Sequence, residues 1–337
     1  MSNKVITIER HIIEEERASH GATGDFSALL RDLTLAIKMI HRDVIRAGLV
    51  DILGATNQEN VQGEIVQKLD EYANSVIFRA MDHGGHLCAM ASEENETLLK
   101  IPDAYPKGKY VLLFDPLDGS SNIDANVSIG TIFSIHRRVT DSGDGTEADC
   151  LQQGYKQIAA GYTIYGPSTM LVYTAGRGVF GFTLDPSVGE FLLSHNDIRI
   201  PEHKGIYSVN EGNYNKWAPE MRKYIDWCKQ DIPEEDKKAY SLRYIGSMVA
   251  DVHRTLLYGG VFLYPADVKS KKGKLRLLYE ANPMSFIVEQ AGGKATDGLG
   301  NRLLDIMPTE LHQRTPLVVG SPGNVDEVES FLQGKRK

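Results

Sequence analysis

The stretch Tyr110-Val-Leu-Leu-Phe-Asp115-Pro-Leu-Asp118-Gly-Ser-Ser-Asn122 decides the fold class and the candidate site of this chain. Its five leading residues are apolar and run into a proline and glycine segment, which predicts a buried strand followed by a turn. A carboxylate at the end of a buried strand is costly unless it is paired or holds a metal. Asp118 can reach the same cation as Asp115, and the Leu117 carbonyl is another oxygen ligand of the kind that Mg²⁺ takes.

Gly119, Ser120 and Ser121 follow at the expected start of a helix. Free backbone N–H groups and hydroxyls at such a junction form a cradle for phosphate. An Asp-Pro turn with an ordinary helix cap would explain an isolated Asp-Gly-Ser, but it does not explain the whole string after a buried strand. The sequence therefore predicts a divalent metal site beside a phosphate site.

The flanking sequence predicts helices before this strand and more strands after it. Apolar residues recur at three- and four-residue steps from Phe26 to Val44, which predicts a long helix opened by Asp25 and closed by Gly48. Residues 61–79 are expected to form more helix. Short apolar runs without intervening helices then predict a largely antiparallel or mixed sheet, with strands near residues 129–135, 158–164, 170–174 and 179–184.

The rhythm changes near residue 200, where we expect a domain boundary. Beyond it the pattern predicts a strand at residues 206–209 and helices at residues 219–229 and 248–257. A last helix is expected to start at Asn282-Pro283 and to stop before Gly292-Gly293.

Composition limits the classes of function. The 337 residues are 42% hydrophobic and 24% charged, which is typical of a globular protein with room for two cores. A formal charge of -8 argues against nucleic acid as the main partner. Residues 1–17 lack the apolar core of a signal peptide, and no stretch approaches the roughly 20 apolar residues that span a bilayer. Three cysteines far apart in sequence indicate free thiols, so we expect a cytoplasmic protein.

Further carboxylates lie in short motifs elsewhere. Glu93 and Glu94 follow Ser92, Glu280 closes an apolar run, and Asp70 follows Lys68-Leu69. Each has an ordinary explanation when taken alone, either a solvated loop or a glutamate at a helix start. Two metal ions need more ligands than Asp115 and Asp118 provide, so these residues become candidates.

Taken in order, the motifs resemble those of the class 1 fructose-1,6-bisphosphatase family. The matching strings are Lys68-Leu-Asp70, Ser92-Glu-Glu94, Asp115 to Asn122, Asn210-Glu-Gly212, Arg243-Tyr-Ile-Gly-Ser-Met-Val-Ala-Asp-Val-His-Arg254, Phe262-Leu-Tyr-Pro265 and Gly273-Lys-Leu-Arg-Leu-Leu-Tyr-Glu280. The wider superfamily, which includes inositol monophosphatases, shares the Glu-Glu and Asp-Pro-x-Asp-Gly parts but not the string that starts at Arg243.

This resemblance implies a layered α-β-α-β-α sugar-phosphatase fold of the α/β class, with mixed sheets and two domains. Residues 1–200 would bind AMP and the metals, and residues 201–337 would bind the sugar phosphate. The implied reaction is Mg²⁺-dependent hydrolysis of the 1-phosphate of fructose 1,6-bisphosphate to fructose 6-phosphate, in gluconeogenesis. The family also implies two or three Mg²⁺ ions per subunit, for which Mn²⁺ can substitute, a homotetramer, and allosteric inhibition by AMP.

The resemblance assigns roles to the matched positions. The metal ligands would be Glu93, Asp115, the Leu117 carbonyl, Asp118 and Glu280. Attacking water would be oriented or deprotonated by Asp70 and Glu94, and a third metal would be reached by Glu64, where the family commonly has aspartate. The 1-phosphate would contact Gly119, Ser120 and Ser121. The 6-phosphate and sugar would contact Asn210, Tyr244, Tyr264, Lys274 and, from a neighbouring subunit, Arg243. AMP would contact Thr23, Gly24, Asp25, Phe26, Ser27, Lys109, Tyr110 and Arg137.

Local sequence alone leaves several alternatives open. On local sequence alone, an ordinary helix cap explains the glycine-bearing turn before Phe26 better than a nucleotide site does. Lys274, Arg276 and Arg243 are cations suited to the distal phosphate. A phosphatase of the same fold could act on sedoheptulose 1,7-bisphosphate or an inositol phosphate. A covalent aspartyl-phosphate hydrolase wants an Asp-x-Asp pair, which this chain lacks here. A non-enzymatic AMP sensor is opposed by the full carboxylate set, and a nucleotide-dependent oxidoreductase by the absence of a strand followed by Gly-x-Gly-x-x-Gly.

Overall fold

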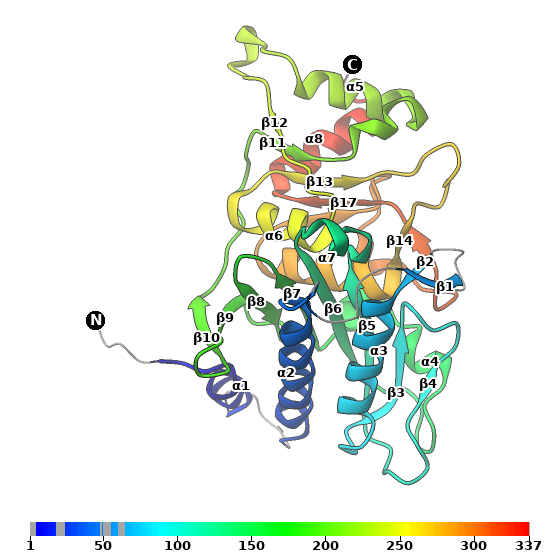
Figure 1. Cartoon of the computed structure of the whole chain (residues 1–337). Helices are drawn as coiled ribbons and strands as arrows, with labels where there is room; N and C mark the ends of the chain where they lie inside the picture. The colour runs from blue at the N-terminus through cyan, green and yellow to red at the C-terminus, as the bar shows by residue number, and fades with distance from the viewer. Residues whose placement is uncertain (1–4, 18–23, 48, 50–54, 60–64, 337) are drawn as a thin grey trace.

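The computed structural model describes residues 5–17, 24–47, 49, 55–59 and 65–336. Helices and sheets alternate in five layers, in the α-β-α-β-α order that the family resemblance implies (Figure 1). The fold is therefore a mixed α/β fold of the predicted class. Thr23, Gly48 and Glu64 lie outside the described residues, so the predictions that concern them are not addressed by the structure.

The first helical layer covers one face of an eight-stranded sheet. Its helices are α1 (Ile8–Arg17), α2 (Asp25–Val44) and α3 (Lys68–Met81). The sheet order is β10-β9-β8-β7-β6-β5-β3-β4. Its strands are β3 (Leu87–Ser92), β4 (Leu99–Lys100), β5 (Tyr110–Asp118), β6 (Ile129–Arg137), β7 (Ala159–Tyr165), β8 (Thr169–Thr174), β9 (Phe180–Asp185) and β10 (Glu190–His195). Strands β3 and β5 are parallel and the other neighbours in this sheet are antiparallel, which confirms the predicted mixed sheet.

The second sheet lies between two further helical layers. It has the order β12-β11-β13-β17-β15, with β11 (Ile206–Ser208), β12 (Ser241–Leu242), β13 (Val261–Tyr264), β15 (Lys294–Thr296) and β17 (Leu317–Gly320). The central helical layer contains α6 (Met248–Tyr258) and α7 (Asn282–Gln290). The outer layer contains α5 (Pro219–Cys228) and α8 (Pro322–Leu332) (Figure 1).

Short elements connect these layers. The two-stranded pairs are β1 (Ala55–Glu59) with β2 (Ile65–Gln67) and β14 (Leu275–Arg276) with β16 (Arg314–Thr315). The short helices are α4 (Glu147–Cys150), the 3₁₀ turns η1 (Ser120–Ala125), η2 (Gly154–Lys156), η3 (Glu211–Lys216), η4 (Pro233–Glu235) and η6 (Leu303–Asp305), and the π-helical turn η5 (Leu277–Ala281).

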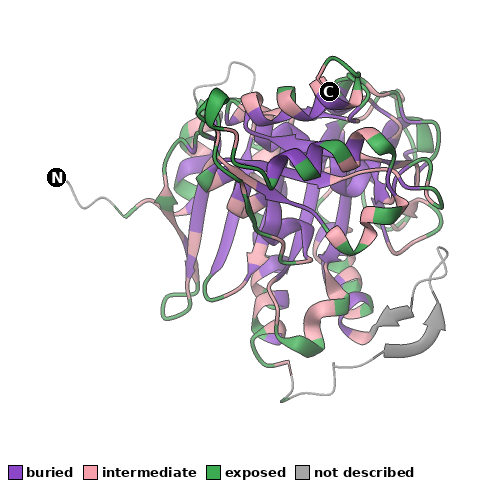
Figure 2. Ribbon diagram, turned by 90° about the horizontal axis from the view of Figure 1, so that it is seen from above, coloured by how far each residue is buried: buried purple, intermediate pink, exposed green. Residues whose placement is uncertain are grey.

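The period-two geometry of the strands explains how one sheet supports two cores. On β6, Phe133 packs in the cluster of α2 and α3, which includes Leu33 and Ile37. The preceding residue, Ile132, faces the other way and packs in the cluster of Val249 and the second sheet. A third cluster joins α5 and α8 to the outer face of the second sheet. Figure 2 shows the resulting buried interior of both sheets.

Two expected boundaries differ from the structure. Helix α3 begins at Lys68, and residues 65–67 form strand β2, so the prediction of helix over residues 61–79 is wrong for those three residues. Their β-branched pair Ile65-Val66 fits a strand, and β1 supplies the backbone partners. Strand β5 continues through Asp118 instead of ending in a turn at Phe114, with its register shifted between Asp115 and Asp118. A proline has no N–H for the ladder, and Pro116 lies at this irregularity.

The domain boundary that we expect near residue 200 stays a prediction. The hydrophobic cluster that contains Val249 and the second sheet includes residues from both sides of this boundary, such as Tyr162 and Phe262. Two domains divided at residue 200 would therefore share one packed core. In the described part of the chain, no helix is both long enough and apolar enough to cross a membrane.

Candidate active site

A cavity of about 560 Å³ lies where the C-terminal half of β5 meets η5 and the start of α6. Most of the residues predicted for the metal, water and 1-phosphate sites line it. They are Asp70, Glu93, Glu94, Asp115, Leu117, Asp118, Gly119, Ser120, Ser121 and Glu280. The structure therefore brings together residues that are more than 200 positions apart in the sequence.

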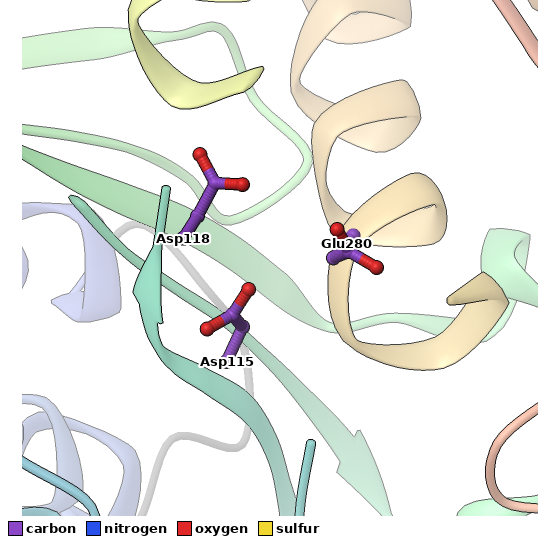
Figure 3. A group of neighbouring side chains, drawn as sticks. All are labelled: Asp115, Asp118 and Glu280. Carbon is purple, nitrogen blue, oxygen red and sulfur yellow. The ribbon is translucent and has the colours of Figure 1, made fainter. Parts of the chain in front are cut away.

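Three carboxylates form the centre of this cavity. Asp115 and Asp118 come from β5, and Glu280 comes from η5 on the facing layer (Figure 3). One oxygen from each lies within 4.8 Å of the others, and all three residues are buried. Oxygen atoms gathered at this spacing suit a hard divalent cation.

Backbone and side-chain donors fix the direction of each carboxylate. Asp115 Oδ1 accepts a hydrogen bond from the Leu117 N–H at 3.0 Å, which closes the irregular turn around Pro116. Asp118 Oδ2 accepts from the Val249 N–H at 2.7 Å and from the Ser247 hydroxyl at 3.4 Å. The first contact places Asp118 at the N-terminal end of α6, where free backbone donors favour a negative charge.

Arg276 lines this cavity, which the sequence did not predict. We expected it at the distal phosphate, but its guanidinium lies 2.5 Å from Glu93 Oε1 and 4.0 Å from Glu280 Oε2. Strand β14 and the π-helical turn η5 carry Arg276 and Glu280 into the carboxylate cluster together. Sequence spacing gives no signal of this position, because residues two apart on a strand share a face and Lys274 lines the other pocket; β14 itself begins only at Leu275.

Burial raises the pKa values of the carboxyl groups in this cavity, and little positive charge lies near them to oppose the shift. Desolvation and then the neighbouring Glu93 raise the pKa of Asp115 well above its ordinary value. Desolvation also raises the pKa of Glu280 to about 8, although Arg276 opposes the shift, and it raises the pKa of Asp118 to about 6. The pKa of Glu94 rises to about 9 through desolvation and then through Glu93. Arg276 alone does not balance the cluster, and a divalent cation would.

Gly119 opens the predicted phosphate cradle. Its φ of 80° is left-handed, and a Cβ there would lie 2.9 Å from the Ser247 hydroxyl oxygen, so glycine suits the position. The 3₁₀ turn η1 follows directly, as the predicted junction requires. Asn122 Nδ2 donates to the Gly246 carbonyl at 3.0 Å and ties the turn to the segment before α6.

The predicted sugar and 6-phosphate residues surround a second, smaller pocket. Asn210, Tyr244, Tyr264 and Lys274 line it, and the two tyrosines also line the first cavity. The two spaces are therefore neighbours across Tyr244 and Tyr264. Arg243 lines neither pocket; it is exposed, and its guanidinium donates to the Leu242 carbonyl at 2.8 Å.

We interpret Asp251 as a structural residue, because it anchors the segment between the two pockets. Its carboxylate accepts from the N–H groups of Ile245 and Gly246, at 2.8 and 2.9 Å, and from the Ser208 hydroxyl at 2.8 Å. These bonds fix the chain between Tyr244 and α6. The interpretation as a structural residue is compatible with these contacts.

The predicted AMP segment also gathers in space. Gly24 is left-handed at the start of α2, and Asp25 Oδ2 lies 2.6 Å from Lys109 Nζ. The ring of Phe26 meets Tyr110 edge to face, with 6.2 Å between the ring centroids. The remaining members lie on the same elements: Arg137 stacks over the Tyr110 ring from the neighbouring strand, and Ser27 lies in the first turn of α2.

Comparisons with known proteins agree with this geometry. Two family models match, described as the N-terminal domain of fructose-1-6-bisphosphatase over residues 6–196 and its C-terminal domain over residues 200–333. The class 1 fructose-1,6-bisphosphatase of Chloroherpeton thalassium is 59% identical, over 98% of this chain and 95% of its own length. That of Pelodictyon phaeoclathratiforme is 55% identical over the full length of both chains. The crystal structure of the Leishmania major enzyme in holo form superposes with a TM-score of 0.91 at 44% identity, and covers 98% of this chain and 99% of its own.

Proposed function

Since the chain belongs to the class 1 fructose-1,6-bisphosphatase family and is a phosphoric monoester hydrolase of that activity, we propose that its carboxylate cavity hydrolyses the 1-phosphate of fructose 1,6-bisphosphate with Mg²⁺. The observation that carries the proposal is that the carboxylate cavity adjoins a second pocket. Three buried carboxylates share one cavity, and the two tyrosines on its wall also line a pocket that contains Lys274.

The family is metal-dependent, and the residues present fit a divalent cation. Asp115, Asp118 and Glu280 are all buried and acidic, with oxygens close enough to share one ion. Glu93 and the Leu117 carbonyl line the same cavity and would complete the ligand set for two or three Mg²⁺ ions, or for Mn²⁺ in their place. When bound, such ions supply positive charge to the phosphoryl oxygens and acidify water.

Proton removal from the attacking water falls to Asp70 and Glu94. Both line the cavity, and Asp70 is buried in the first turn of α3. The raised pKa of Glu94 makes it a better proton acceptor than an exposed glutamate, once it is ionised. The chain therefore has a general base on the side of the cavity that α3 covers. Whether Glu64 assists them stays a prediction.

Positioning supplies the rest of the rate enhancement, because the transition state of phosphoryl transfer is loose. The N–H groups and hydroxyls of Gly119, Ser120 and Ser121 would hold the 1-phosphate. Asn210, Tyr244, Tyr264 and Lys274 would hold the sugar and the 6-phosphate. Water then gives up a proton and attacks phosphorus in line with the departing sugar oxygen. The P–O bond to the sugar breaks, the sugar oxygen takes up a proton from solvent and leaves as a hydroxyl, and no covalent enzyme intermediate forms.

We further propose regulation and assembly by the family pattern. Gly24, Asp25, Phe26, Ser27, Lys109, Tyr110 and Arg137 lie at one end of α2 and would receive AMP, with Thr23 beside them in sequence. Arg243 is exposed and lies outside both pockets of its own chain, which suits a residue that serves a neighbouring subunit of a tetramer. A cytoplasmic location stays a prediction.

Phosphate release from fructose 1,6-bisphosphate, with and without Mg²⁺, tests the proposed mechanism. We expect wild-type activity to require Mg²⁺ and Asp118→Ala to lose more than about a hundredfold, which is roughly the 3 kcal/mol that one well-placed charge supplies. Asp141→Ala, an exposed acid on the loop after β6, is the matched control and should retain full activity. Equal activity of Asp118→Ala and wild type would refute the assignment of the site.

A further inference from the structure

The pocket that we assign to the distal phosphate contains an acid. Asp267 and Lys274 are the two charged side chains among the described residues that line it. The Asp267 side chain is 5% exposed, whereas that of Lys274 is 39% exposed. A buried carboxylate therefore lines a space proposed to receive a phosphate dianion, beside the cation that would attract it.

The contacts of Asp267 divide between its two oxygens. Oδ1 accepts from the N–H groups of Lys269 and Ser270, at 2.8 and 2.7 Å, and so shapes the loop before Lys274. Oδ2 lies 3.5 Å from Lys274 Nζ. The backbone donors, led by Ser270, lower the pKa of Asp267, so the group is charged at neutral pH.

The hydrogen bonds of the loop need an acceptor at Oδ1 but do not need a negative charge on Asp267. A side-chain amide would offer the same Oδ1 acceptor to Lys269 and Ser270, and would place an uncharged group beside Lys274. The three other lysines of this loop do not line the pocket in the described structure: Lys269, Lys271 and Lys272. Among the residues of this chain that line the pocket, the positive charge therefore comes from Lys274, and Asp267 opposes it directly.

From this arrangement we propose that Asp267 weakens the binding of the distal phosphate and so promotes release of fructose 6-phosphate. The inference rests on the proposed function, because it takes this pocket as the 6-phosphate site. Asp267 repels the bound phosphate and competes with it for the Lys274 ammonium. Two unit charges about 4 Å apart in a water-like dielectric give roughly a fivefold effect on affinity.

Asp267→Asn tests the proposal, since it removes the charge and keeps the loop acceptor. We expect the inhibition constant of fructose 6-phosphate and the KM for fructose 1,6-bisphosphate to fall roughly fivefold. The half-saturating Mg²⁺ concentration should stay at the wild-type value, because Asp267 does not line the carboxylate cavity. Asp297→Asn is the matched control: Asp297 Oδ1 caps an equivalent turn, accepting from Leu299 and Asn301, and lines neither pocket.

The outcomes separate the inference from the proposed function. Unchanged or weaker binding of fructose 6-phosphate by Asp267→Asn, with a wild-type melting temperature, would overturn the role of Asp267. Lys274→Met should raise both constants at least tenfold; if it leaves them unchanged, the assignment of this pocket to the 6-phosphate is wrong. A change in Mg²⁺ dependence in Asp267→Asn would also count against the inference, since it would show an effect on the whole site.

Discussion

Metal uptake by the carboxylate cavity should release protons. Near pH 7, Glu280 with a pKa of about 8 is mostly protonated in the metal-free protein, and Glu94 with a pKa of about 9 is almost fully so. Burial and Glu93 also hold the pKa of Asp115 well above its ordinary value, which favours its protonated form. Metal ligands must be deprotonated to bind, and the charge of a bound cation favours the ionised form of a nearby carboxyl such as Glu94. We therefore expect Mg²⁺ to displace between about two and three protons per chain at pH 7.

Isothermal titration calorimetry in buffers of different ionisation enthalpy measures this number. The observed heat should vary linearly with the buffer enthalpy, and the slope gives the protons released. Glu94→Gln should lower the slope by about one proton and still bind metal, because Glu94 is placed on the water and not on the ion. Asp141→Asn, in an exposed loop, should not change it. A heat that is the same in every buffer would refute the electrostatic reasoning.

Three further outcomes follow from the same structure. The metal-free protein should melt at progressively lower temperatures as the pH rises from about 4.3 to about 8 and 9, because Glu280 and Glu94 have raised pKa values in the fold. Their uncharged forms stabilise the fold fully below about pH 4.3, and this contribution is lost by the pH at which they ionise in the fold; Mg²⁺ should restore the melting temperature in differential scanning fluorimetry. Phe114→Ala should lower the free energy of unfolding, measured with urea, by about 3–5 kcal/mol, because this side chain is fully buried in the hydrophobic cluster of α2 and α3. Lys109→Ala should raise the AMP concentration that half-inhibits activity at least tenfold; an unaltered value would contradict the AMP assignment.

Local patterns were sufficient for the elements that carry their own signals. The helical stripe from Phe26 to Val44 became α2, and the apolar run from Tyr110 to Phe114 became the start of β5. The continuation of β5 through Asp118 was missed because proline and glycine normally end a strand, whereas β6 pairs with this strand on both sides of the irregularity. Strand β2 was missed because its partner comes from another segment, which periodicity within one segment cannot reveal.

The sequence predicted which residues form the site, but not how their side chains are arranged in space. Each carboxylate alone has an ordinary explanation, and the family resemblance joined them. The position of Arg276 shows what spacing leaves undetermined: it is two residues from Lys274, which lines the smaller pocket, yet its guanidinium contacts Glu93 in the carboxylate cavity. Asp267 illustrates the same limit, since nothing local to its loop indicates that one oxygen would face Lys274.

Anomalous diffraction from crystals grown with Mn²⁺ would test most directly whether the acidic residues of β5 and η5 hold the catalytic ions. We predict anomalous peaks bonded to Asp115, Asp118 and Glu280, at the roughly 2.0–2.2 Å typical of small divalent cations. The same peaks should disappear from Asp118→Ala together with phosphate release. Peaks elsewhere in an active crystal, with these three side chains free of metal, would contradict the account.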